Sequence, residues 1–364
     1  MARSVLALFL VACVAPLTFA WPYGEQPVRG VNLGGWLVLE KWMTPNVFSG
    51  LPDNVNDEYK LTQHLGYAEA EKRLRSHWDT WVTEADIIKF KNAGLNHATG
   101  LLTLRTANHG FPEVGTMPSR LQAGAGPHGL QVMMDLHGAP GSQNGNDHSG
   151  QSGSIGFYYN DENLQRSVNV VRQIARWANA SEWRNTVSII QTLNEPILWD
   201  DYDYRLGRLK DYYGMAYHAV REVNDLAVVA VHDAFIDLTN WYYFRDDPQY
   251  WWVMLDTHLY QVFGDEYQGL TCEQHAALAC RYRDRLGDAN SKLWTVVGEW
   301  SLATPHSCNN QGDIARQQIG VYENSGSGYF FWSHNNGQNW AEWSMKHSLD
   351  NGWIRPSENN VAYC

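Results

Sequence analysis

Short runs of apolar, β-prone residues alternate with longer amphipathic runs along most of the chain. The amphipathic runs place apolar positions at helical spacing, which predicts helices between the strands. The seven runs that predict buried strands cover residues 28–39 (a strand and its following loop), 131–137, 187–193, 226–232, 252–258, 293–299 and 328–332. The helices are predicted over residues 78–93, 163–178, 204–224, 274–286 and 315–322. Such alternation is typical of a parallel sheet with crossover helices.

One further strand is expected between Asn96 and Gly129, where the pattern fails. Residues 98–126 are rich in Gly, Thr and Pro and show little periodicity, so they are interpreted as coil in place of a strand and a helix. Eight strands with intervening helices predict an α/β fold, a single-domain (β/α)8 TIM barrel, with an atypical or defective second-strand region at residues 98–128.

Two glutamates end predicted strands. Glu195 follows the apolar run 187–193, and Glu299 follows the run 293–297. A carboxylate at the C-terminal end of a barrel strand lies at the face where barrel enzymes hold their catalytic groups. Two carboxylates facing each other across one barrel mouth are the arrangement that cleaves a glycosidic bond. A solvated loop carboxylate is the simpler interpretation of either glutamate taken alone.

The N-terminus predicts export. Residues 1–20 combine Arg3, an apolar stretch and a small-residue cleavage site before Trp21, as in a secretory signal peptide. The mature chain, residues 21–364, is then expected to be one catalytic domain, secreted to the extracellular space or cell wall. The net charge of −12 argues against nucleic acid and anionic membrane as partners. We expect a monomer.

Four cysteines remain after the predicted signal. An even number in an oxidising compartment predicts two disulfides, and their spacing leaves three pairings open. The cysteines are Cys272, Cys280, Cys308 and Cys364. Asn179 opens an Asn-Ala-Ser sequence that is a candidate N-glycosylation site. The 17 Trp and 19 Tyr suit sugar binding, because the apolar faces of sugar rings stack on aromatic planes.

Several ordered segments resemble one known family. They read RGVNLGGWLVLE at residues 29–40, DLHGAPGSQNG at 135–145, LNEP at 193–196, HDAF at 232–235, DTHLYQVF at 256–263 and GEWS at 298–301. Together they resemble the fungal exo-β-1,3-glucanases (glucan 1,3-β-glucosidases) of glycoside hydrolase family 5. The resemblance implies a retaining enzyme without a cofactor or metal, acting on β-1,3-glucan polysaccharides or oligosaccharides.

The resemblance also assigns roles to residues. Glu299 would be the nucleophile that forms a covalent glycosyl-enzyme, and Glu195 would be the acid and then the base. Because like charges repel, Glu195 is expected to keep its proton beside an ionised Glu299. Tyr260 would bond the nucleophile and help to keep it ionised.

The remaining roles concern the sugar that is released, in the subsite next to the cleaved bond. Asn194 would bond its 2-hydroxyl, and Trp332 would form the floor beneath it. The residues that would line or close this subsite are His137, His258, Tyr260, Glu40 and Asp147. Phe263 would stack on the next sugar outside. A closed pocket of this kind cuts from chain ends.

The chain departs from the family in ways that bear on activity. An arginine that holds the nucleophile, in a Val-Arg-Ile-Pro-type segment after the second strand, has no counterpart after His97. We interpret this bounded loss as a wrong reading frame or a missed splice in the gene model, which sequencing of the transcript would test. If the segment is real, Glu299 loses a cationic partner and its pKa should rise. Asn146 stands where an aromatic clamp is usual, and His148 where Asn is usual.

Three alternatives follow. An endo-acting β-glucanase or transglucosylase on the same site would raise reducing ends without free glucose. A catalytically impaired glucan-binding homologue would bind laminarin without hydrolysis. A defective gene product would not fold. The dinucleotide-like letters at residues 124–129 precede a strand rather than open a helix, so nucleotide binding is rejected. No serine-hydrolase elbow stands in a strand-turn-helix setting.

Overall fold

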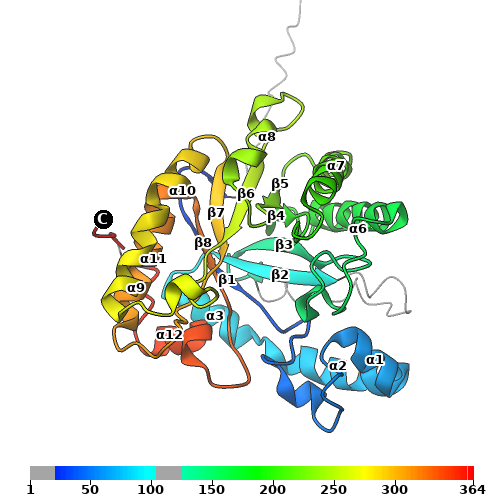
Figure 1. The fold of residues 1–364 in the computed structure, drawn as a ribbon, viewed down its shortest axis with the longest axis horizontal. Coiled ribbons are helices and arrows are strands. Elements are labelled where there is room, and N and C mark those ends of the chain that lie inside the picture. Colours follow the sequence, from blue (N-terminus) through cyan, green and yellow to red (C-terminus); the bar gives the residue numbers. More distant parts are fainter. Residues whose placement is uncertain (1–20, 104–124, 359) are drawn as a thin grey trace, which may run out of the picture.

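A computed structural model describes residues 21–103, 125–358 and 360–364. Within these residues, eight parallel strands close into a barrel whose order around the ring is the order along the chain. Figure 1 shows the strands at the centre and the helices around them. The strands are β1 (Val28–Asn32), β2 (His97–Thr103), β3 (Gln131–Gly138), β4 (Val187–Gln191), β5 (Val228–His232), β6 (Val253–His258), β7 (Trp294–Glu299) and β8 (Gly328–Phe331). The predicted (β/α)8 barrel is confirmed.

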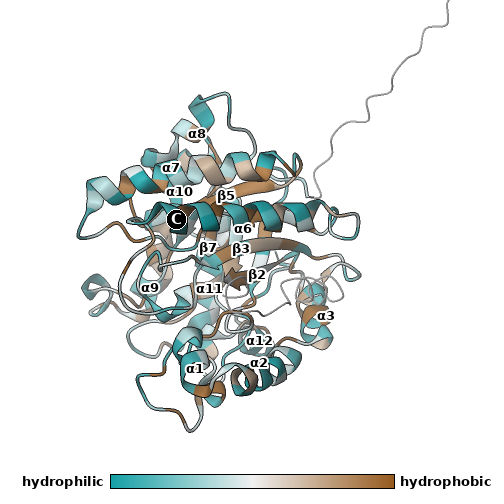
Figure 2. Ribbon diagram, turned by 90° about the vertical axis from the view of Figure 1, so that its right-hand side faces the viewer, coloured by the Kyte–Doolittle hydropathy of each residue, from teal (hydrophilic) through white to brown (hydrophobic). Residues whose placement is uncertain are grey.

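Helices cover the outside of the barrel (Figure 1). They are α1 (Glu58–Leu65), α2 (Tyr67–Trp81), α3 (Glu84–Ala93), α6 (Asp161–Asn179), α7 (Tyr202–Arg221), α8 (Tyr243–Asp246), α9 (Cys272–Leu278), α10 (Arg283–Asn290), α11 (Gln311–Ser325) and α12 (Met345–Asp350). In Figure 2 the outer helices α6 and α7 are largely hydrophilic, whereas the strands beneath them are hydrophobic. None of the helices in the described residues has both the length and the apolar character needed to cross a membrane.

The strands are buried on both faces, which explains why they read as apolar runs rather than as alternating ones. Every residue of β4, β5 and β6 is buried. Side chains such as Met133, Ile189, Met254 and Phe330 fill the barrel interior, while the opposite faces of the strands pack against the helices. This packed interior leaves the C-terminal ends of the strands as the place where a pocket can form.

The coil interpretation of the second-strand region was wrong for its first residues. Strand β2 pairs with β1 from His97 to Thr99 and with β3 from His97 to Thr103. Ala98, Leu101 and Leu102 are buried. The Ala-Thr-Gly sequence has a weak strand preference, but two neighbouring strands offer hydrogen-bond partners on both sides, and tertiary context overrides local preference. The barrel therefore has no open edge at β2. Residues 104–124 lie outside the described residues.

Two predicted helices are divided in the structure. The run 78–93 contains the end of α2 and all of α3, because Val82 is extended and Thr83 caps α3 in a capping box with Asp86. Gly94 ends α3 in the left-handed conformation, as expected. The run 274–286 likewise divides into α9, a 3-10 turn η6 (Ala279–Tyr282) and the first turn of α10.

Two disulfides are present, as the cysteine count predicts. Cys272 bonds to Cys308, and Cys280 bonds to Cys364. The second bond fastens the C-terminus to η6 on the outside of the barrel. The predicted signal peptide, residues 1–20, lies outside the described residues.

Candidate active site

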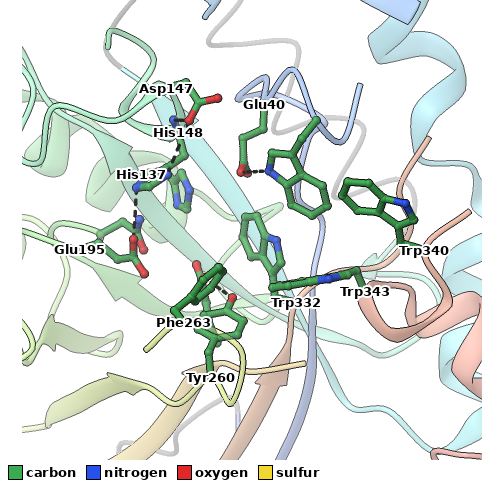
Figure 3. A pocket seen from close by; sticks show the side chains of 13 residues that line it. Glu40, His137, Asp147, His148, Glu195, Tyr260, Phe263, Trp332, Trp340 and Trp343 are labelled. Atoms are coloured by element: carbon green, nitrogen blue, oxygen red, sulfur yellow. Dashed lines mark hydrogen bonds and ion pairs between the residues drawn. The ribbon is translucent and has the colours of Figure 1, made fainter. Parts of the chain in front are cut away.

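The C-terminal ends of the strands converge on one pocket of about 330 Å³. Glu195 follows β4, Glu299 ends β7, and His137 lies near the end of β3. The residues that line the pocket are Glu40, Trp42, His137, Asp147, His148, Asn194, Glu195, Tyr260, Phe263, Glu299, Trp332, Trp340 and Trp343. Figure 3 shows their side chains from close by, with Glu40 and Tyr260 on opposite sides of Trp332.

Nine of the residues singled out in the sequence line this pocket, namely Glu40, His137, Asp147, Asn194, Glu195, Tyr260, Phe263, Glu299 and Trp332. His258 does not line it but contacts both glutamates. The residues come from loops and strand ends that are far apart in sequence. Their convergence follows from the closed barrel, which brings all eight C-terminal strand ends to one face.

The two glutamates lie close together. Nδ1 of His258 is 2.6 Å from Oε1 of Glu195 and 3.6 Å from Oε2 of Glu299. The two carboxylate oxygens can be no farther apart than these two distances placed end to end. One oxygen of each glutamate thus lies within reach of the same imidazole, and carboxyl groups close together are typical of retaining glycosidases, whereas inverting ones leave room for a water between them.

Histidines surround Glu195. Besides its bond to His258, its Oε2 is 3.1 Å from Nε2 of His148. Burial alone would raise the pKa of Glu195, but the hydrogen bonds and charges of His148 and His258 hold it well below its usual range. Burial also acts to lower the pKa of His148, yet the neighbouring carboxylates, Glu195 first, raise it to about 9. The pair is therefore an imidazolium and a carboxylate at neutral pH.

Glu299 has the opposite tendency. Burial raises its pKa well above the ordinary value, and the charge of Glu195 adds to the effect, against His258 and a hydrogen bond donated by Tyr260 at 2.7 Å. Among the described residues, His258 is the only cationic group recorded within ion-pair distance of Glu299. The expected distribution, with the proton on Glu195 and the charge on Glu299, is thus reversed. The reason is that His148, in the loop after β3, and His258, at the end of β6, both contact Glu195, and sequence reasoning did not foresee the contact of His148.

His258 links the two carboxylates. Burial would lower its pKa, but the charges of Glu299 and Asp256 and the bond to Glu195 raise it well above the ordinary value. Its other nitrogen, Nε2, lies 3.3 Å from Asp256. A cationic His258 can therefore stabilise a negative charge on either glutamate.

Acidic and aromatic groups close one end of the pocket. Oε2 of Glu40 accepts a hydrogen bond from the indole of Trp42 at 2.7 Å, and Oε1 of Glu40 is buried with no partner among the described residues. Burial, with the charge of Asp147, raises the pKa of Glu40 to about 7, against the charge of His148. An unpaired buried carboxylate oxygen is costly unless a ligand hydroxyl bonds it.

The floor of the pocket is aromatic. Trp332 is 4% exposed and stacks on His137 with ring centroids 5.7 Å apart and planes 6° from parallel. His137 is held from behind by Asp135, with Nδ1 and Oδ2 2.7 Å apart. Nδ2 of Asn194 is buried with no partner among the described residues. The pocket thus combines a flat apolar surface with polar atoms free to bind, as sugar pockets do.

Sequence reasoning missed three pocket tryptophans and the role of His148. Trp42 stacks on Trp340 with ring centroids 5.7 Å apart, and its edge packs on Trp343. Trp340 and Trp343 lie in the segment after β8. Residues that follow the C-terminal end of any barrel strand are expected at the active-site face, so this position could have identified them, as it did the glutamates of β4 and β7. His148 was noted only as a departure from the family.

Within the described residues, two clusters bring potential metal ligands together. In the first, Cys272 and Cys308 are already joined as a disulfide, which removes both thiolates beside His306. In the second, Glu195, His232 and His258 lie within reach of one ion. Nδ1 of His232 accepts the backbone N–H of Ala234 at 2.9 Å, so its Nε2 carries the proton and has no lone pair to offer. This donor set does not fit a metal.

The candidate glycosylation site ends a helix. Asn179 is the last residue of α6, and its Nδ2, the atom that a glycan would occupy, donates to the carbonyl of Val223 at 2.8 Å. A glycan on Nδ2 would leave that nitrogen one N–H to donate. The site stays a prediction.

The family follows from a comparison of sequences. The sequence model described as Cellulase (glycosyl hydrolase family 5) matches residues 122–338. The chain belongs to glycoside hydrolase family 5. Curated relatives of this family 5 chain include the probable glucan 1,3-beta-glucosidase A of Emericella nidulans, which is 38% identical over 309 residues, covering 83% of this chain and 72% of the relative. The glucan 1,3-beta-glucosidase of Blumeria graminis is 37% identical over 312 residues, covering 83% and 71%.

Solved structures support the same fold. The family 5 chain resembles the rutinosidase from Aspergillus niger with a TM-score of 0.78 at 20% identity, covering 90% of this chain and 98% of that one. At this identity the likeness supports the barrel and not the substrate.

Proposed function

We propose that the chain is a secreted exo-β-1,3-glucanase that releases glucose from the non-reducing ends of β-1,3-glucans with retention of anomeric configuration. The observation that carries the proposal is the close pair Glu195 and Glu299 beside His258, at the base of a small pocket with an aromatic floor. Relatives named glucan 1,3-beta-glucosidase support the choice of a β-1,3-glucan as substrate.

In the first step, Glu299 attacks the anomeric carbon while Glu195 protonates the departing oxygen. The bond between the two sugars breaks, a glycosyl ester forms on Glu299, and the shortened glucan leaves with the proton of Glu195. Tyr260, whose hydroxyl donates to Oε2 of Glu299, orients the attacking carboxylate. A covalent route through two displacements is what a short carboxylate separation permits.

In the second step, Glu195 accepts a proton from water as the water oxygen attacks the anomeric carbon, and the bond between that carbon and the carboxylate oxygen of Glu299 breaks. Formation of the ester removes the charge of Glu299, so that Glu195 no longer faces a like charge. Glucose then leaves with its original configuration, because two inversions have occurred. His258 contacts both carboxylates and stabilises the charge wherever it lies in the cycle.

The first step needs the proton on Glu195, whereas the side chains by themselves favour it on Glu299. Two carboxylates this close titrate as a pair that shares one proton. Because Nδ1 of His258 lies close to both carboxylates, the proton can pass between Glu195 and Glu299 without a large movement of either side chain. We infer that a hydrogen bond from Glu195 to the glycosidic oxygen selects the productive arrangement.

The closed end of the pocket supports release of single glucose units. Glu40 and Asp147 would bind the hydroxyls of the terminal sugar, and Asn194 its 2-hydroxyl. Trp332 would lie beneath the ring, and Phe263, which is 66% exposed at the mouth, would contact the next sugar. A glucan whose non-reducing end contacted Glu40 could extend only outward, past the mouth of the pocket.

The location and processing of the chain belong to the same proposal. Residues 1–20 would direct export and be removed, and residues 21–364 would act as the catalytic domain. The two disulfides support an oxidising compartment. The enzyme would act as a monomer without a cofactor.

The products from laminarin test this function. Purified chain should release free glucose from the start of the reaction, and glucose should appear first as the β anomer by NMR. Larger oligosaccharides with little glucose would favour an endo-acting enzyme or transglucosylase. Binding to laminarin without any product would favour the catalytically impaired homologue.

A further inference from the structure

One cluster of metal-binding side chains lies outside the pocket. Sγ of Cys272 is 3.9 Å from Nε2 of His306, and Sγ of Cys308 is 4.0 Å from the same nitrogen. In a tetrahedral zinc site, bonds of ~2.3 Å to sulfur and ~2.0 Å to nitrogen leave the bonded sulfur and nitrogen atoms about 3.5 Å apart. His306 therefore already stands close to the distance that a shared metal ion would impose between it and each sulfur.

His275 supplies a fourth nitrogen. It lies three residues after Cys272 in α9, and its ring centroid is 5.6 Å from that of His306. Nδ1 of His275 lies 3.0 Å from Oε1 of Gln261, an oxygen that can only accept, so Nδ1 carries the proton and Nε2 keeps its lone pair. That Nε2 is buried and has no partner among the described residues. A ring oriented through one N–H, with its other nitrogen free, is the usual arrangement of a metal-binding histidine.

Contacts other than the disulfide hold the cluster together. Nδ2 of Asn310 donates to the carbonyl of Cys272 at 3.1 Å, which ties the segment after β7 to the start of α9. In the same segment, Oγ1 of Thr304 donates to the carbonyl of His306 at 2.6 Å. Helix α11, which follows this segment, packs beside α9 on the outside of the barrel (Figure 1). The four side chains should therefore stay close together when the disulfide is open.

The types of ligand select the metal. Two thiolates and two neutral imidazoles are a common ligand set of structural zinc sites, whereas calcium and magnesium prefer oxygen ligands. Burial, with the charge of His306, lowers the pKa of His275, which favours the neutral ring that a metal needs. His306 is exposed, so an ion can reach the cluster from solvent.

We propose that Cys272, His275, His306 and Cys308 bind a zinc ion in the reduced chain, and that this zinc site and the disulfide exclude each other. Metal binding turns both thiols into zinc-bound thiolates and releases their two protons. Oxidation by a low-molecular-weight disulfide forms the bond between Cys272 and Cys308, takes up two protons, and releases the zinc ion and two thiol molecules. Either state joins α9 to the segment after β7. A newly made chain, whose cysteines are still thiols, thus has this link before oxidation.

Cobalt binding tests the site. The full chain is reduced with a phosphine under argon, separated from the reductant and titrated with Co²⁺, whose absorption spectrum reports tetrahedral geometry and thiolate ligands. One equivalent should give both signals, and Zn²⁺ should abolish them by displacing the cobalt. His275→Ala and His306→Ala should each weaken Zn²⁺ binding about tenfold or more. His64→Ala, which removes an exposed histidine at the end of α1, should leave it unchanged.

The second cysteine pair is the matched control. Among the described residues, Cys280 and Cys364 belong to no group of potential metal ligands. The double variant Cys272→Ala and Cys308→Ala keeps that pair, so its reduced form should give no tetrahedral cobalt spectrum. The same spectrum in this variant, or none in a reduced wild-type chain that keeps its near-ultraviolet circular dichroism, would overturn the site. A wild-type chain that unfolds on reduction and does not refold with Zn²⁺ would overturn it as well.

The rate of oxidation tests whether metal and disulfide exclude each other. With oxidised glutathione as the disulfide, the bond between Cys272 and Cys308 should form about tenfold or more slowly with Zn²⁺ than with a chelator, because the metal holds the attacking thiolates. The bond between Cys280 and Cys364 should form at the same rate in both, as measured by peptide mapping. Equal rates for the first bond would reject the exclusion. None of these readouts uses a glucan, so their outcome is independent of the proposed function.

Discussion

At the scale of single residues, the site depends on how two glutamates and two histidines share charge. Glu195 contacts His148 on one side and His258 on the other, whereas the close polar contacts of Glu299 among the described residues are with His258 and Tyr260. Burial acts on both glutamates, so the two imidazoles decide which one keeps the negative charge. Of the two histidines, His148 is the one that forms an ion pair with Glu195 and none with Glu299 among the described residues.

Replacing His148 should change the pH dependence of activity. The acid Glu195 must be protonated in the first step, so kcat/KM falls on the alkaline side as it loses its proton. His148→Asn removes a cation that lowers the pKa of Glu195, and the alkaline limb should therefore move to higher pH by about 1–3 units. The control is His64→Asn, since His64 is exposed at the end of α1. An alkaline limb at the same pH in all three proteins would show that His148 does not govern Glu195.

Sequence reasoning identified most of the pocket residues, without Trp42, Trp340 and Trp343, but not the charges of the glutamates. Glu40, Asn194 and Trp332 follow from motifs at strand ends, and the barrel brings these ends together. The proton distribution depends on distances of about one hydrogen bond between His148, His258 and Glu195. Those distances are set by how two loops fold over the barrel mouth, and no spacing along the chain encodes them.

At the scale of elements, β2 is the informative case. Its Ala-Thr-Gly sequence places one β-branched residue, Thr99, between two residue types that are depleted in strands, and the segment after it lies outside the described residues. The strands whose boundaries the sequence predicted closely, such as β3 and β6, are continuous apolar runs. Strand β2 instead owes its conformation to β1 and β3, whose edges would otherwise be unpaired.

Hydrogen exchange should show β2 as a protected strand. Backbone amides in residues 97–102 pair with neighbouring strands, so they should exchange as slowly as those of β3 in peptides measured by mass spectrometry. Exchange within seconds in residues 97–102, beside slow exchange in β3, would instead favour the coil interpretation. The peptides of α3, which precede β2, give an internal reference for a packed helix.

At the scale of the whole molecule, two disulfides fasten loops on the outside of a barrel that has a large core of its own. Cys280 and Cys364 are 84 residues apart, and Cys272 and Cys308 are 36 apart. None of the four lines the pocket. Cross-links stabilise a protein mainly by restricting the unfolded chain, and more so for longer loops. Stability and catalysis should therefore respond separately to their loss.

Removal of Cys280 and Cys364 together, as a double Ala variant, should lower the free energy of unfolding by about 2–5 kcal/mol. The corresponding variant of Cys272 and Cys308 should lose about 0.8 kcal/mol less, because the loop is shorter. Denaturant unfolding measures both, with glucose release from laminarin as the check on the site. A loss of activity in the folded Cys280 and Cys364 variant would show that the C-terminus supports the pocket.

The central claim is that Glu299 attacks the sugar and Glu195 serves as acid and base. The most direct test is to treat the chain with 2-deoxy-2-fluoro-β-glucosyl fluoride, which forms the glycosyl ester and slows its hydrolysis. Mass spectrometry of the digested protein should then find one fluoroglucosyl group, on the peptide that carries Glu299 and on that side chain, and none in Glu299→Gln. A label on Glu195 would reverse the two roles, and an active enzyme that takes up no label would contradict the covalent mechanism.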